Sequence, residues 1–129
     1  MTHGREFLSS SLTDITQALV KLRVPFCPDE YDLHALVASA LKEADIAYLH
    51  EERLAQRCRI DFLAGNVGIE VKKGKPVRKQ LISQLERYAA SPRVDALVVV
   101  VERAADLPGA IMGKPCVTLS MNRLWGIAL

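Results

Sequence analysis

The chain has 129 residues, of which half are hydrophobic and a quarter are charged, and its formal net charge is +2. This length suits one ordinary domain, spanning residues 1–129. The apolar fraction excludes a disordered chain. A net charge this small does not indicate a nucleic-acid partner, so only a local basic cluster could do so.

Three widely spaced cysteines, Cys27, Cys58 and Cys116, form no CxxC pair. An odd number without paired spacing argues against a disulfide framework and against a structural zinc site, so we expect small buried side chains. No apolar segment follows residues 1–5 as in a signal peptide, and the longest apolar run, 96–101, is too short to cross a membrane. We therefore expect a cytoplasmic protein with no membrane partner.

Two amphipathic helices are predicted first, over residues 6–23 and from Pro28 to about Asp45. Proline is accepted in a first helical turn, and the acids that follow Pro28 favour the positive end of the helix dipole. In the second helix an apolar stripe recurs at i, i+3, i+4, i+7 and i+8, formed by Leu33, Leu36, Val37, Ala40 and Leu41.

The pattern then changes to that of strands. Residues 46–49 predict a strand, with 51–53 near its end or in the next one, and 59–63 and 67–71 predict a hairpin around the turn 64–66, where Gly65 and Asn66 supply unusual backbone angles. A third helix follows over 76–90, with Val77 on its apolar side. After it we expect a strand buried on both faces over 95–101, a strand over 116–119, and a short strand or helical tail over 124–129. This order predicts an α/β sandwich around a mixed central sheet.

Three charged residues stand inside the predicted hairpin, whose strands are otherwise apolar: Asp61, Glu70 and Lys72. Alternation places Ile60 and Phe62 on one face and Asp61 on the other, and it places Glu70 and Lys72 on a common face. Two neighbouring carboxylates repel unless a proton or cation lies between them, and Mg²⁺ prefers oxygen ligands. A lysine beside them can hold a phosphate or an attacking water, so the set suits phosphodiester hydrolysis.

The bare spacing has a simpler interpretation, a salt bridge between Glu70 and Lys72 with an exposed Asp61. Acids and lysines are common, and on spacing alone this interpretation is favoured. The surroundings favour a site, because charges are disfavoured inside strands of Ile, Phe, Leu and Val.

The segments Arg59-Ile60-Asp61-Phe62 and Glu70-Val71-Lys72 resemble the two half-motifs of the PD-(D/E)XK nuclease superfamily, with Ile60 in place of the named proline. The resemblance implies a restriction-endonuclease-like fold, an α-β-β-β-α-β core preceded here by an extra helix. The elements expected between Pro28 and Val101 have the same order.

Gln84 and Tyr88 are similar to the QxxxY motif of the branch that includes recombination helicase-nuclease and phage exonuclease domains. At i and i+4 they share a helix face. The resemblance implies that Gln84 orients the lysine or binds DNA near the metal, and that Tyr88 meets nucleic acid. The alternative for Tyr88 is core packing with its hydroxyl at the edge.

The resemblance also implies a metal site at Asp61, Glu70 and Val71, holding Mg²⁺ or Mn²⁺, and a further catalytic acid on the first core helix. Glu30 is the best match for that acid, with Asp32 as the other choice and Glu51 as a candidate from the segment before the motif. Either helical acid could instead be an ordinary first-turn acid.

A basic run without acids begins at the end of the second hairpin strand and contains Lys72, Lys73, Lys75, Arg78 and Lys79. Such runs are more often solvated surface. Because this one follows the candidate catalytic strand and leads into a helix N-terminus, we expect it to bind the DNA backbone without sequence preference.

The sequence thus predicts a Mg²⁺-dependent deoxyribonuclease that works as a homodimer or beside a helicase or recombination partner. Two alternatives stay open. The first is a non-catalytic DNA- or protein-binding module on the same fold, and the second is an unrelated α/β protein in which these acids form surface salt bridges.

Overall fold

The structure is a computed structural model that describes the backbone of residues 2–22, 29–103 and 105–121, with side chains from residue 11 onward. Its elements in chain order are α1 (Thr2–Val20), α2 (Glu30–Glu43), β1 (Leu49–Ala55), β2 (Cys58–Ala64), β3 (Val67–Lys72), α3 (Arg78–Ala89), β4 (Ala96–Val101), β5 (Ala110–Ile111) and β6 (Lys114–Ser120).

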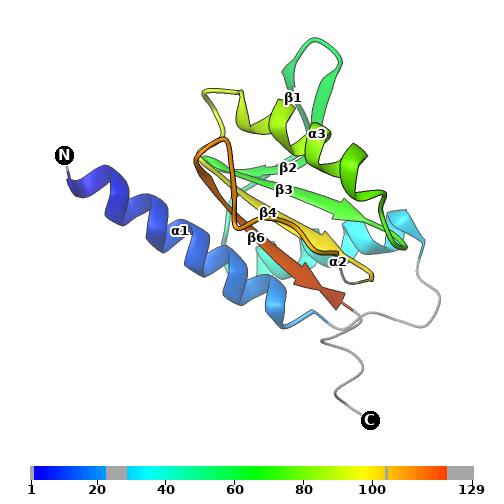
Figure 1. Ribbon diagram of the computed structural model, residues 1–129. Helices are drawn as coiled ribbons and strands as arrows, with labels where there is room; N and C mark the ends of the chain where they lie inside the picture. The colour runs from blue at the N-terminus through cyan, green and yellow to red at the C-terminus, as the bar shows by residue number, and fades with distance from the viewer. Residues whose placement is uncertain (1, 23–28, 104, 122–129) are drawn as a thin grey trace.

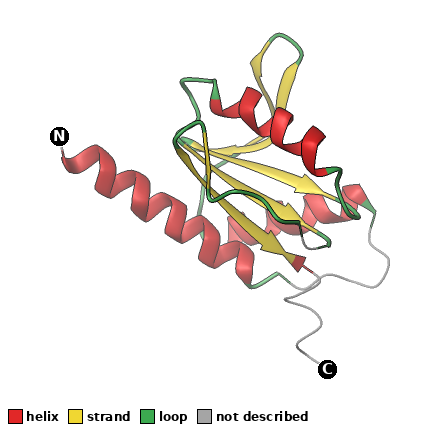
Figure 2. Cartoon of the chain, in the orientation of Figure 1, coloured by secondary structure: helices red, strands yellow, loops and turns green. Residues whose placement is uncertain are grey.

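The strands form one six-stranded mixed sheet in the order β1-β2-β3-β4-β6-β5. The β1–β2, β2–β3 and β5–β6 pairs are antiparallel, whereas β3–β4 and β4–β6 are parallel. Helices α1 and α2 cover one face of the sheet and α3 covers the other (Figures 1 and 2). The predicted α/β class with a mixed central sheet is confirmed.

Each face of the sheet has its own apolar cluster. The cluster under α1 and α2 includes Leu19, Leu33, Val37, Phe62, Ile69, Val71, Val98 and Val100. The cluster under α3 includes Cys58, Ile60, Leu63, Leu81, Leu85, Tyr88, Leu97, Val99 and Cys116. Every residue of β4 is buried, which confirms a strand enclosed on both faces. Cys58 and Cys116 are buried free thiols as expected, and Cys27 lies outside the described residues.

Helix α2 has a defined cap at each end. At its start Asp29 and Asp32 form a capping box, in which each side chain accepts the backbone N–H of the other. At its end Asp45 takes a φ of 59°, and the N–H groups of Asp45 and Ile46 donate to the carbonyls of Lys42 and Leu41. This is a Schellman arrangement, and it closes the helix.

That closure corrects the predicted strand over 46–49. Ile46 belongs to the helix cap, and β1 begins only at Leu49. Helix α3 begins at Arg78 and not at Pro76, because Val77 keeps an extended backbone as the N-cap residue, and its side chain is 60% exposed. Val77 was wrongly assigned to the apolar side.

Two turns also differ from expectation. In the β2–β3 turn only Gly65 takes a positive φ, whereas Asn66 instead ties the turn to the start of β4 through its hydrogen bond to Asp95. Strand β5 was missed, since its turn into β6 uses Met112 and Gly113 with φ of 51° and 76°, and Met is unusual there. The prediction for 124–129 lies outside the described residues.

Candidate active site

The site lies where β2 separates from β3. The β2–β3 ladder joins Ala64 to Val67, Leu63 to Gly68 and Phe62 to Ile69, and it ends there. Strand β2 continues beyond that point paired only with β1, as a two-stranded hairpin that projects past the sheet (Figure 1). We call the point of separation, at Asp61 and Glu70, the fork.

The side chains of Asp61 and Glu70 replace the ladder bonds that the fork lacks. Asp61 Oδ2 accepts the backbone N–H of Val71 at 2.8 Å. The backbone N–H of Asp61 in turn points at Glu70 Oε1, at 3.4 Å, which is a long hydrogen bond. The two acids are therefore brought together, by backbone groups that a continuous ladder would have used.

The fork also corrects the predicted side-chain alternation in β2. Phe62 packs under α1 and α2, but Ile60 packs in the cluster under α3. The bend at Asp61 turns Ile60 over Gly68, where a Cβ would lie only 2.5 Å from Ile60 Cδ1. Glycine at 68 is what lets β2 cross β3 this closely.

Glu70 is an almost fully buried acid, with 2% of its surface exposed. Lys72 Nζ lies 3.1 Å from Glu70 Oε2. Burial raises the pKa of Glu70 and the nearby Asp61 adds to the increase, while Lys72 lowers it, and the net result is a pKa of about 7. A buried carboxylate with a raised pKa is stabilised in its ionised form by a nearby cation.

Tyr88 supports the fork from α3. Its ring is 2% exposed, and its hydroxyl donates to the carbonyl of Arg59 at 3.1 Å. Burial raises the pKa of Tyr88, with further increases from Glu70 and Asp61. The alternative of core packing describes the position of Tyr88, whose buried side chain anchors the hairpin, and its contact with nucleic acid stays a prediction. Gln84 lies one turn earlier and is partly exposed, and its contact with the lysine stays a prediction.

None of the contacts among the described residues joins the candidate fourth acids to Asp61 or Glu70. Glu30 is exposed in the first turn of α2. Asp32 is committed to the capping box. Glu51 is exposed, with its carboxylate 4.0 Å from Arg59 Nη1. For Asp32 the alternative of an ordinary first-turn acid describes its position.

Two histidines that the sequence did not single out lie near the fork, and one of them, His34, stands beside Asp61. His34 of α2 lies with Nε2 3.6 Å from Asp61 Oδ2 and with Nδ1 3.0 Å from His50 Nε2. The His50 ring stacks on Phe62, with centroids 4.7 Å apart. The sequence offered one signal for His34: it is a polar residue directly next to Leu33, at the edge of the apolar stripe of α2.

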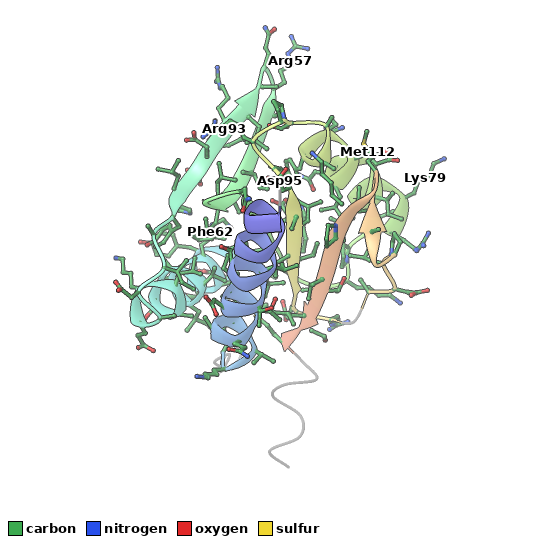
Figure 3. The ribbon with its side chains drawn as sticks, turned by 90° about the vertical axis from the view of Figure 1, so that its left-hand side faces the viewer. Arg57, Phe62, Lys79, Arg93, Asp95 and Met112 are labelled. Carbon is green, nitrogen blue, oxygen red and sulfur yellow. The ribbon has the colours of Figure 1, made fainter. Side chains whose placement is uncertain are left out.

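The basic residues after β3 surround a tight turn. Lys73, Lys75, Arg78 and Lys79 are all exposed, and Lys79 points away from the body of the molecule (Figure 3). Gly74 takes a φ of 70°, and its N–H donates to Glu102 Oε2 at 2.9 Å. We call this surface, Lys73–Lys79, the basic turn, and it stays accessible to an anion.

A magnesium ion fits the donor chemistry of the fork. Within residues 11–22, 29–103 and 105–121, no three His, Cys, Asp or Glu side chains are grouped as a metal site. Mg²⁺ needs less than that, because it is bound through one or two carboxylates and keeps several waters. Asp61 and Glu70 supply that number, and His34 stands next to Asp61.

Comparison of the chain with protein-family models, with curated proteins and with solved structures finds no match. Among the described helices, none is both long and apolar enough to cross a membrane.

Proposed function

We propose that the protein is a Mg²⁺- or Mn²⁺-dependent nuclease that hydrolyses phosphodiester bonds in DNA. The observation that carries the proposal is the meeting of Asp61, Glu70 and Lys72 at the fork, with Glu70 buried and its pKa raised to about 7. Burying Glu70 beside a second, partly exposed acid is costly, and catalytic sites are where such costs are retained. We further propose that α2-β1-β2-β3-α3-β4 is a restriction-endonuclease-like core with α1 as the extra helix.

In this proposal Asp61, Glu70 and Val71 form the metal site, and the two carboxylates supply its charged ligands. The N–H of Val71 fixes the Asp61 carboxylate, and the Tyr88 hydroxyl fixes the strand that carries it. A bound Mg²⁺ would lower the pKa of a coordinated water and offset charge on the phosphate. Lys72, already within 3.1 Å of Glu70, is placed to orient that water or a phosphate oxygen.

The test is a cleavage panel with linear, circular, single-stranded, branched and RNA substrates, in Mg²⁺, Mn²⁺ or EDTA. We expect metal-dependent cleavage of DNA, with a loss of at least about 100-fold in Glu70→Gln, Asp61→Asn and Lys72→Met. Glu86→Gln, at an exposed position of α3, is the matched control and keeps full activity. Full cleavage in EDTA, or by the Glu70→Gln protein, would refute the proposal.

One observation favours a second candidate, a DNA- or protein-binding module without catalysis. Lys72 is already paired with Glu70, and the Val71 N–H and His34 already contact Asp61, so the acids are satisfied without a metal. Such a module would bind DNA equally well with and without divalent metal and leave every substrate intact. Dimerisation, a helicase or recombination partner and a cytoplasmic location stay predictions.

A further inference from the structure

The β1–β2 hairpin beyond the fork carries a second basic surface, apart from the basic turn. Here β2 has no β3 neighbour, and its register with β1 pairs Glu52 with Ile60, Arg53 with Arg59 and Ala55 with Cys58. The hairpin projects past the sheet (Figure 1), and Arg57 stands at its outer end (Figure 3).

The two faces of this hairpin differ sharply in chemistry. Its inner face packs Leu54, Cys58 and Ile60 into the cluster under α3. Its outer face exposes three arginines, Arg53, Arg57 and Arg59, which we call the arginine face. Because the inner face is anchored, and Tyr88 holds the Arg59 carbonyl, the arginine face is presented on a supported ribbon.

The register makes this arrangement electrostatically unfavourable in the protein alone. Arg53 and Arg59 are directly opposite each other, and like charges at facing positions of two strands destabilise their pairing. The nearest relief is Glu51, whose exposed carboxylate lies 4.0 Å from Arg59 and contributes little at that exposure. Arg53 and Arg57 make no ion pair within the described part of the chain.

The neighbouring acid Glu52 does not neutralise the arginine face. Its carboxylate bonds Arg93 at 2.6 Å, and Arg93 also donates to the Arg53 carbonyl. That pair braces the hairpin against the end of α3 and leaves Arg53 and Arg57 without an ion-pair partner among the described residues. Arginines held close together on a supported hairpin are suited to a polyanion, since each guanidinium can bind a phosphate through two parallel hydrogen bonds.

The arginine face and the basic turn belong to the two arms of the fork. Arg59 precedes Asp61 by two residues on β2, and Lys73 directly follows Lys72 at the end of β3. A phosphate chain that runs from one basic surface to the other therefore passes the acids between them. A two-stranded ribbon is also narrow enough to enter the major groove of a duplex.

We propose that the arginine face binds the phosphate backbone of duplex DNA on one side of the fork, while the basic turn binds it on the other. This inference rests on the proposed function, because it takes DNA as the substrate. It assigns to the hairpin the role of aligning the duplex with Asp61 and Glu70.

The experiment measures binding of a short fluorescent duplex by anisotropy, in EDTA, over a series of KCl concentrations. Each phosphate contact contributes about 0.9 to the slope of log K against log salt, so the Arg53→Gln/Arg57→Gln/Arg59→Gln variant should lose about 2.7 of that slope. Arg57→Gln alone should lose about 0.9. Its matched control Lys42→Gln, at an exposed position near the end of α2, should lose nothing.

The triple replacement by lysine keeps the charge and should keep the slope, which separates a charge effect from a folding defect. An unchanged slope in the glutamine variant would overturn the inference, as would an equal loss on a single-stranded oligonucleotide. Arginine-dependent duplex binding without any cleavage in Mg²⁺ or Mn²⁺ would refute the nuclease and support the surface. Cleavage that survives the glutamine variant at high salt, together with an unchanged slope, would refute only the surface.

Discussion

Strand β4 and the fork lie side by side in the same sheet, but β4 contains no charged residue whereas the fork contains two acids. In β4 every residue is apolar and buried, and its ladders to β3 and β6 are continuous. At the fork the ladder stops, and two acids enter. Glu70 and Val99 are even registered partners across β3 and β4. The difference shows that, within β2, β3 and β4, carboxylates stand only where backbone N–H groups are left free to bond them.

The largest expected effect on stability comes from placing an acid in β4, where the backbone N–H groups are already used by the ladders. Val99→Glu would bury a carboxylate where both flanking ladders are complete, so its charge or its proton would have no partner. We expect a loss of more than about 4 kcal/mol, enough to unfold a typical domain. Circular dichroism would show it, and Val99→Ala, which only leaves a cavity, should still fold. A folded Val99→Glu protein would contradict the comparison.

Removing the buried negative charge at the fork, by Glu70→Gln, should increase the free energy of unfolding. The pKa of Glu70 is raised from an ordinary 4.5 to about 7, so ionising it costs the folded state. That cost is absent below pH 4.5, grows as the pH rises and is complete above pH 7. Glu70→Gln removes it and should gain up to about 3 kcal/mol at pH 8 in EDTA.

Urea unfolding at pH 5 and pH 8 checks this prediction. The wild-type protein should lose stability over that interval, and Glu70→Gln should lose much less, while Glu86→Gln follows the wild type. A gain for Glu70→Gln that is equal at both pH values would mean that its charge is not the cause.

Lys114 is a charged side chain outside the fork that is also held by free backbone groups, in this case carbonyls. Lys114 Nζ donates to the carbonyls of Ala89, Ser91 and Val94, at 2.6, 3.2 and 2.6 Å, and so ties the end of α3 and the loop before β4 to the start of β6. Lys114→Met removes a charged donor from three carbonyls and should cost about 2 kcal/mol. Thermal unfolding measures it against Lys42→Met, and equal midpoints would show that the tie contributes nothing.

The smallest effect is expected at Gly68. An alanine Cβ there would meet Ile60 Cδ1 at 2.5 Å and Leu97 Cδ2 at 3.2 Å, so buried side chains must shift. We expect Gly68→Ala to cost about 1 kcal/mol. Ile60→Val removes the contacting methyl group, and in a double-mutant cycle it should reduce that cost. Additive effects of the two substitutions would show that the close approach is not what requires glycine.

The regular parts of the fold could be predicted because their signals are local. The β-branched run over 96–101 specifies a buried strand by itself, and the stripe from Leu33 to Leu41 specifies α2. Asp61, Glu70 and Lys72 could be singled out for a similar reason, since charges inside apolar strands are conspicuous in the sequence.

The remaining features depend on contacts between distant segments. The bend at Asp61 arises because Ile60 finds its place under α3, which alternation along one strand cannot reveal. His34 reaches the site, and meets His50 of β1, only once α2 packs against the sheet, and neither histidine belongs to a spaced motif. The bond from Tyr88 to β2 could not be predicted, because a helical pattern gives the face of a residue but not whether a strand covers its hydroxyl.

Strand β1 forms an edge of the sheet, and its irregular course limits how this protein can meet other chains. Glu51 takes a φ of 53° within the strand, and further along the register with β2 shifts between Arg53 and Ala55. An edge interrupted twice, and lined with charged side chains, is a poor template for an added strand and so resists edge-to-edge aggregation. A partner that approaches β1 therefore meets side chains rather than a free row of backbone hydrogen bonds.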